Sequence, residues 1–263
     1  MLAKLLKYDL KYMLKNMSVF YIFALFFAIT TRIFFSIEQT VIVNIVGSIS
    51  AGCMISMLVN ILINTMMISW VRFRNSIYKD EAYLTHTLPV TKNDIYNSKF
   101  IQALVFFIVG FMVIILSIFI AYYTKDNWML LKEFVSGITI GLNFNSSLFV
   151  VSIIFIIFLE IFNAIQCGFL GIILGYKKNN NKIGFSVLYG FISYILVQCL
   201  VLLLVFIVGI FDSNIMDLFK NNILLNTDSL KLLVILAIVT YMIIIAFMSF
   251  VCKKILNNGV NIE

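Results

Sequence analysis

The apolar residues of this chain are gathered into six long stretches that alternate with short polar segments. An α-helix needs roughly 20 mainly apolar residues to cross about 30 Å of hydrocarbon, and each stretch is close to or above that length. We therefore predict six transmembrane helices, at Ser18–Ser36, Val41–Trp70, Ile95–Tyr123, Leu148–Tyr176, Ile183–Phe211 and Leu232–Cys252. The predicted fold class is an all-α integral membrane protein, with residues 1–263 forming a single transmembrane domain.

Residues 1–17 repeat apolar and basic positions at helical spacing. The apolar side holds Leu2, Leu5, Leu6, Leu10, Met13, Leu14 and Met17, and the basic side holds Lys4, Lys7, Lys11 and Lys15. A helix with two such sides lies in the plane of the membrane interface. We expect an N-terminal interfacial amphipathic helix, retained as an anchor because no small-residue cleavage site follows the first span. An ordinary basic flank without a defined helix is the alternative.

Composition supports the membrane assignment. Of the 263 residues, 62% are hydrophobic and 12% are charged, and the mean hydropathy is +1.07. The net charge of +7 comes from short basic clusters beside the apolar spans, as expected near an anionic leaflet, so nucleic-acid binding is not expected. The four cysteines lie inside predicted spans without close pairing, which argues against a disulfide framework or a zinc site.

The distribution of the 19 lysines and arginines predicts the orientation. When both termini are placed in the cytoplasm, the cytoplasmic side holds Lys4, Lys7, Lys11, Lys15, Arg72, Arg74, Lys79, Lys92, Lys99, Lys177, Lys178, Lys182, Lys253 and Lys254. The outer side holds only Arg32, Lys125, Lys132, Lys220 and Lys231. Because cytoplasmic loops carry an excess of Lys and Arg, the expected topology is N-in and C-in.

The longest strongly polar stretch, residues 72–94, lies between the second and third spans. From Phe73 onward, Ile77, Leu84 and Leu88 fall on one helical face, which predicts a short amphipathic helix that runs up to Pro89. Proline disfavours helical backbone in the residue before it, so the helix should end there.

A second helix should begin just after this proline. Thr91 and Asp94 form a Thr-x-x-Asp pattern before the apolar run from Ile95, which predicts that Thr91 caps the third span. Helix, corner and helix would form a cytoplasmic elbow suited to receive force from a partner.

The segment Asp80-Glu81-Ala82-Tyr83-Leu84-Thr85-His86-Thr87-Leu88-Pro89-Val90 resembles the D-E-G-Y-L-T-x-T-L-P-V signature of permease subunits of bacterial ATP-binding-cassette exporters of the type-2 transporter class. In that family the loop after the second span carries the coupling helix, which docks into a groove of a separately encoded ATPase subunit. An N-terminal interfacial helix is likewise a family feature. The motif covers only residues 80–90, whereas the architecture covers most of the chain; Ala82 replaces the family's glycine.

The resemblance implies that residues 72–94 form a cytoplasmic coupling segment. Its ATPase-coupling residues would be Asp80, Glu81, Tyr83, Leu84, Thr85, Leu88 and Pro89. The chain has no G-x-x-x-x-G-K-[ST] phosphate loop, so ATP and Mg are expected on a partner ATPase and no cofactor or metal on this chain. A complete transporter would need a second permease subunit, in a homodimer or a heterodimer, within the lipid bilayer of the bacterial cytoplasmic membrane. A merely solvated linker is the alternative.

An intramembrane enzyme is the main rival interpretation. A zinc protease needs an H-E-x-x-H helix, which a single histidine does not supply, and no G-x-S-x-G elbow is present. His86 has no obvious partner beyond Asp80 and Glu81, so an exposed polar role is favoured and no catalytic residue is expected. A stand-alone channel or secondary transporter is the other alternative.

Polar residues inside the fourth span suggest a substrate path. Glu160, Asn163 and Gln166 follow one another at three-residue steps. An ionisable group at that depth is costly, so Glu160 should face protein or water rather than lipid. The small residues that follow, Gly168, Gly171 and Gly175, should let a neighbouring helix approach closely.

The second span carries a polar ridge with a four-residue repeat, formed by Asn44, Ser48, Gly52, Ser56, Asn60 and Asn64. The ridge drifts by about 40° per step because a helix turns every 3.6 residues. It could line a cavity, with Ser56 and Asn60 on the path, or hydrogen-bond between helices at roughly 0.6–2 kcal/mol each. Both readings stay open here.

Two outer features complete the prediction. Arg32 is expected to snorkel to the surface and to pair with Glu38. Residues 212–229 form an external segment that either re-enters the membrane or lies on its surface. The predicted function is the permease subunit of an ATP-driven exporter, and the resemblance to the exporter permeases implies an amphipathic peptide, drug-like or lipid-like substrate. Export of antimicrobial peptides, or immunity to them, is one such role.

Overall fold

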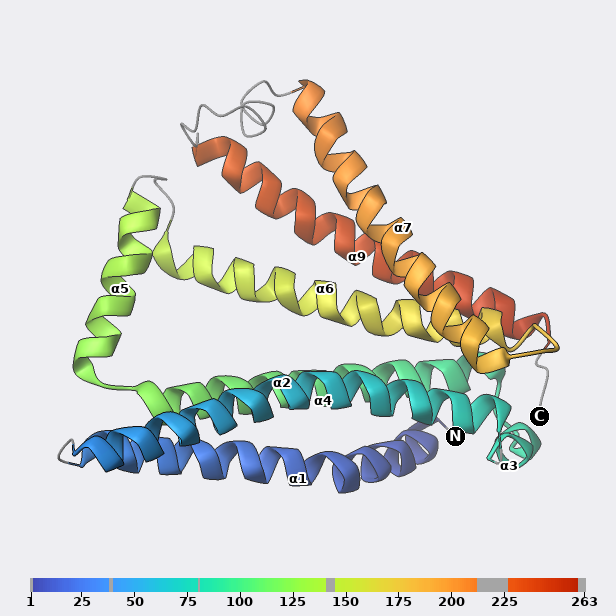
Figure 1. The fold of residues 1–263 in the computed structure, drawn as a ribbon. Coiled ribbons are helices and arrows are strands. Elements are labelled where there is room, and N and C mark those ends of the chain that lie inside the picture. The colour runs from blue at the N-terminus through green and yellow to red at the C-terminus, as the bar shows by residue number, and fades with distance from the viewer. Residues whose placement is uncertain (1, 38–39, 80, 141–144, 212–226, 260–263) are drawn as a thin grey trace. The chain divides into compact units, whose positions relative to one another are not determined.

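The computed structural model describes residues 2–37, 40–79, 81–140, 145–211 and 227–259. Within these ranges every regular element is a helix (Figure 1). The helices are α1 (Leu2–Ser36), α2 (Val41–Tyr78), α3 (Ala82–Thr87), α4 (Lys92–Tyr122), α5 (Lys125–Ile140), α6 (Ser146–Gly175), α7 (Lys182–Phe211) and α9 (Thr227–Asn257). The predicted all-α fold class is confirmed for this part of the chain.

Six helices in the described ranges are long and apolar enough to cross a membrane: α1, α2, α4, α6, α7 and α9. They contain the six spans predicted from the sequence, with ends that agree to within a few residues except where α1, α2 and α9 extend further. The architecture is therefore that of a multi-pass membrane protein. Glu38 and residues 212–226 of the predicted external segment lie outside the described residues.

The chain divides into two compact units, with the boundary after Trp128. Unit 1 is built on α1, α2 and α4, each of which packs against the other two, and α3 packs on α2. Unit 2 is built on α6, α7 and α9. The single transmembrane domain predicted from the sequence stays a prediction.

The core cluster of unit 1 combines alanines and methionines with larger aliphatic and aromatic side chains. Helix α1 contributes Met13, Met17, Tyr21, Ala24 and Ala28; α2 contributes Met54, Leu58 and Ile61; α4 contributes Phe106 and Ala121. The alanines allow neighbouring helices to pack near the α1 backbone, and the methionines fill irregular gaps. Further along, the Ser50 hydroxyl of α2 lies 2.7 Å from that of Thr30 and 3.0 Å from that of Thr31 on α1.

Residues 2–17 do not form a helix separate from the first span, which corrects the prediction. They are the first turns of α1, which continues without interruption to Ser36. No glycine or proline occurs in this range to break the helix. The predicted sidedness holds in part: Met13 and Met17 are fully buried in the core of unit 1 and the lysines are exposed, but Leu14 is exposed.

The polar stretch after the second span also differs from the prediction of one amphipathic helix up to Pro89. Helix α2 continues to Tyr78, the chain turns at Lys79, and α3 begins at Ala82. The predicted common face does not exist, because Ile77 is 1% exposed and Leu84 is 71% exposed. Helical phase cannot carry across the break between the two helices.

Unit 2 contains a very close contact between two helices. A Cβ atom added at Gly171 of α6 would lie 2.5 Å from the backbone nitrogen of Gly190 and 2.5 Å from the carbonyl oxygen of Ser186, both on α7. A Cβ at Gly175 would likewise collide with the backbone of Ser186. The predicted close approach at these glycines is confirmed, and Figure 1 shows α6, α7 and α9 side by side toward one end.

Helix α5 was not predicted from the sequence. Its first turn is capped by Thr124, whose hydroxyl accepts a hydrogen bond from the backbone nitrogen of Asn127 at 3.1 Å. The Thr-x-x-Asn spacing was the available signal. At 16 residues it is shorter than the candidate spans.

Candidate functional site

Helix α3 has an inner face and an outer face. Ala82 and Thr85 are buried, whereas Tyr83, Leu84 and Leu88, which caps the helix, are exposed. Ala82 stands where the motif has glycine, and its methyl group is enclosed. A six-residue helix in water would not hold its shape alone, so the contacts of the inner face must fix it.

Two contacts attach α3 to the end of α2, and a third lies within α3 itself. The hydroxyls of Ser76 and Thr85 lie 3.4 Å apart. The Nε2 atom of His86 lies 3.2 Å from the carbonyl oxygen of Ile77. The Thr85 hydroxyl also donates to the carbonyl oxygen of Glu81 at 2.8 Å. His86 is therefore a half-buried structural residue, and these contacts give it no nucleophile to activate.

The corner after α3 follows the prediction. Leu88 has φ −68° and ψ 144°, the extended backbone that Pro89 imposes on its neighbour. The Thr91 hydroxyl accepts from the backbone nitrogen of Asp94 at 3.1 Å and donates to its carboxylate at 2.8 Å. Thr91 therefore caps α4, and the elbow and the third span are continuous in structure.

A cluster of buried charges lies at the same end of unit 1. The Asp9 carboxylate of α1 accepts from Lys99 Nζ of α4 at 2.5 Å, from Ser98 Oγ of α4 at 2.8 Å and from Arg72 Nε of α2 at 3.1 Å. Arg72 also donates through Nη1 to both carboxylate oxygens of Glu81, just before α3. We call these five residues the Asp9 cluster.

The Asp9 cluster is balanced in charge and mostly shielded from solvent. It holds two carboxylates and two cations, and the Arg72 guanidinium also stacks 4.6 Å above the ring of Tyr12. Removing one partner from a buried ion pair costs about 3–5 kcal/mol, because it leaves a buried charge without compensation. The cluster thus joins α1, α2, α4 and the start of α3. Removing any one of its charged members should lower the free energy of unfolding substantially.

Comparisons with known protein families, with curated proteins and with solved structures found no match. The resemblance to the exporter permeases therefore rests on residues 80–90 and on the six long helices.

The predicted ATPase-coupling residues separate into three groups. Tyr83, Leu84, Leu88 and Pro89 are exposed on the outer side of the elbow. Thr85 faces inward. Glu81 is about half exposed and is held by Arg72, and Asp80 lies outside the described residues. The described members of this set therefore comprise an outward apolar group and an inward anchoring group.

Sequence reasoning missed Asp9, Ser98 and the pairing roles of Arg72 and Lys99. A signal for Asp9 was present: it is the only acid among the lysines of residues 1–17, and it precedes Met13 and Met17 at four-residue steps on the buried face. A carboxylate on an apolar face needs a partner. The partners lie up to 90 positions away, so the spacing of residues did not reveal them.

The predicted path residues of unit 2 have different surroundings from one another. On α6, Glu160 is half-buried and accepts a long, 3.4 Å hydrogen bond from the Tyr194 hydroxyl of α7. Gln166 donates to Ser249 of α9 at 2.7 Å and to the carbonyl oxygen of Ile245 at 3.3 Å. Asn163 is fully buried, and neither of its amide atoms has a hydrogen-bond partner within the described part of the chain.

Ser56 and Asn60 belong to unit 1, and the structure gives them a simpler role. Ser56 is exposed and Asn60 is half-buried, and the Asn60 amide donates to the carbonyl oxygen of Ser56 at 2.9 Å. Asn64 repeats the pattern on Asn60. These amides donate to backbone carbonyl oxygens of their own helix. The described contacts of Asn60 and Asn64 are therefore hydrogen bonds within α2 rather than between helices.

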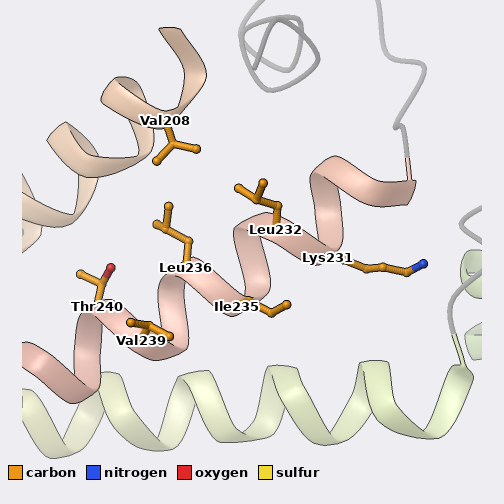
Figure 2. A pocket seen from close by; sticks show the side chains of 7 residues that line it. All are labelled: Val208, Lys231, Leu232, Ile235, Leu236, Val239 and Thr240. Carbon is orange, nitrogen blue, oxygen red and sulfur yellow. The ribbon is translucent and has the colours of Figure 1, made fainter. Parts of the chain in front are cut away.

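A groove in unit 2 lies between α7 and α9 (Figure 2). It has a volume of about 540 Å³ and is lined by Val208 of α7 and by Lys231, Leu232, Ile235, Leu236, Val239 and Thr240 of α9. Figure 2 shows Leu232 and Leu236 pointing toward Val208, whereas Lys231 extends away from it. The lining is apolar with one cation at its end. No group of metal-ligating side chains occurs among the described residues.

Proposed function

We propose that this chain is the membrane-spanning permease subunit of an ATP-driven exporter in the bacterial cytoplasmic membrane. The observation that carries the proposal is the elbow formed by α3 and the first turn of α4. Its outer side presents exposed apolar residues, and its inner side is bonded to the end of α2, which the Asp9 cluster joins to α1 and α4. A surface of this kind can receive a push and pass it to the helices.

The outer side of the elbow suits a protein partner better than lipid. Tyr83 and Leu84 are exposed, but Lys79 precedes them and Lys92 and Asp94 follow shortly after. A hydrophobic patch rimmed by charges is typical of a protein contact. Because the chain has no phosphate loop, the partner we propose is a cytoplasmic ATP-binding-cassette ATPase, which binds the ATP and Mg.

Transmission to the transport path would begin at the corner. The Thr91 cap makes α4 continuous with the elbow, so a displacement of α3 tilts or shifts the third span. The path itself would form between this chain and a second permease subunit. In this mechanism the chain performs no chemistry of its own.

The substrate class we propose is an amphipathic peptide, drug-like or lipid-like molecule. The groove between α7 and α9 supports it, because its mainly apolar lining suits the apolar part of such a molecule. Glu160 and its Tyr194 partner place further polar groups within unit 2.

The elbow can be tested by co-purification. The chain is co-expressed with the ATP-binding-cassette ATPase of an adjacent reading frame, and Leu84→Asp is compared with Leu131→Asp on α5, another exposed leucine. Leu84→Asp should reduce the recovered ATPase at least tenfold, since a buried carboxylate would replace an apolar anchor in the interface. Leu131→Asp should leave it unchanged.

Two results would contradict the proposal. One is an ATPase that binds the Leu84→Asp variant as well as the unaltered chain. The other is purified chain that moves a substrate or passes ions across liposomes with neither ATPase nor nucleotide, which would favour a channel or secondary transporter.

A further inference from the structure

Asp9 holds the first turns of α1 against α2 and α4. Its side chain is fully buried, and its two oxygens are used by Lys99 and Ser98 of α4 and by Arg72 of α2. Leu5, Leu6 and Leu10 around it are only partly buried, so apolar packing alone holds this part of the helix less firmly than the core further along. The carboxylate is therefore the main polar link between the beginning of α1 and the third span.

Only one charged member of the Asp9 cluster is readily reached from solvent. The side chain of Glu81 is 45% exposed, whereas those of Arg72, Lys99 and Asp9 are 13%, 1% and 0% exposed. If α3 moved and took Glu81 away from Arg72, the three remaining groups would keep one uncompensated positive charge in a buried place. That state is unfavourable, so α3 and the ends of the three long helices are expected to move together.

We propose that Asp9 is a positioning residue for energy coupling, which transfers a displacement of α3 to α1 as well as to α4. This inference rests on the proposed function, because it assumes that an ATPase pushes the elbow. It changes the mechanism in one respect: the beginning of α1 acts as a second driven element instead of a passive anchor on the membrane surface.

The charge balance of the cluster separates this role from plain stabilisation. Asp9→Asn leaves an excess positive charge, and Lys99→Met leaves an excess negative charge. The double variant is neutral again, because the Arg72–Glu81 pair keeps one charge of each sign. The double variant therefore restores electrostatic balance without restoring the Asp9–Lys99 link between α1 and α4.

The first measurement needs no transport activity. Unfolding of the full chain in detergent is compared for both single variants and the double variant, with Asp126→Asn, an exposed acid on α5, as control. Each single variant should shift the unfolding equilibrium by roughly a hundredfold or more, and the double variant by much less than the product of the two. Independent, multiplicative effects would overturn the Asp9–Lys99 link.

The second measurement follows movement in the complex with the ATPase, in lipid nanodiscs. In a chain whose four cysteines are replaced, spin labels at position 11 on α1 or position 92 on α4 are each paired with a label at position 179. Distances are recorded without nucleotide and with ATP plus vanadate. In the chain with native Asp9 and Lys99, both distances should change when ATP plus vanadate is added. In Asp9→Asn/Lys99→Met, the distance from position 92 on α4 should still change, whereas the distance from position 11 on α1 should change much less.

The outcomes distinguish the two proposals. A double variant that binds the ATPase and keeps the full nucleotide-dependent change at α1 overturns the role of Asp9 and leaves the proposed function standing. If the chain with native Asp9 and Lys99 shows no nucleotide-dependent change at either label, or no ATPase binds it, the proposed function fails and this inference fails with it.

Discussion

Replacing Gly171 by alanine is expected to force α6 and α7 apart. The new Cβ would lie 2.5 Å from two backbone atoms of α7, the nitrogen of Gly190 and the carbonyl oxygen of Ser186, whereas ordinary contact begins near 3.4 Å. Backbone atoms cannot rotate out of the way as a side chain can. The helices must therefore separate by about 1 Å at this point, the difference between the two distances.

The cost follows from the packing that is lost. A gap of roughly 0.5–1 Å removes a quarter to a half of the dispersion energy of each atom pair, and overpacking of a tight interior typically costs about 1–3 kcal/mol. We expect Gly171→Ala to lower the free energy of unfolding by about 2 kcal/mol, roughly a 30-fold change in the folded-to-unfolded ratio. The assay is reversible unfolding in mixed detergent micelles, followed by circular dichroism.

Two other glycines provide matched controls for the same substitution. Gly190 lies in the same interface, but its added Cβ would be 3.5 Å from the nearest atom, the Cys167 carbonyl oxygen; at Gly52 of α2 nothing lies within 4 Å. Both changes should be nearly neutral, or stabilising by up to about 1 kcal/mol through helix propensity. If Gly171→Ala and Gly190→Ala have equal effects, the close approach of the two backbones is refuted.

Two further predictions concern a helix cap and a buried amide. Thr91→Ala should lower the free energy of unfolding by about 1 kcal/mol, because the Asp94 backbone nitrogen loses its acceptor; Thr91→Ser should restore it, and equal stability of both variants would exclude a capping role. Asn163→Leu should leave stability unchanged or raise it by about 1–3 kcal/mol, because it removes a buried amide without a described partner. Lower stability in the same unfolding assay would mean that the amide has a structural partner.

The spans, the Thr91 cap and the glycine contact were predictable because each depends on residues close together in sequence or on one helical face. A short sequence pattern is enough to predict each of them: about twenty apolar residues for a span, Thr-x-x-Asp for the cap, and regularly spaced glycines for the close contact. The continuity of α1 was missed because its lysines suggested an interfacial helix, although a chain without glycine or proline had no reason to break there.

The Asp9 cluster could not be predicted from the sequence because its hydrogen-bonded partners lie 9 to 90 positions apart. The apolar residues Ile77, Leu84 and Leu88 were expected to fall on one helical face. Instead, the break before α3 lets Glu81 fold back onto Arg72 while Leu84 points outward. Contacts with α1 and α4 determine which charged side chain of this segment faces inward. A helical wheel drawn for residues 72–94 alone contains no information about those contacts.

The order in which the cluster is synthesised has a consequence for biogenesis. Asp9 leaves the ribosome 90 residues before Lys99, which at synthesis rates of about 5–20 residues per second is a delay of roughly 5–20 s. During that time the carboxylate has to stay hydrated at the membrane surface, and only the arrival of the third span allows it to be enclosed. A chain arrested before that point would expose an unsatisfied acid, which gives the cell's quality-control proteases a simple mark of incomplete assembly.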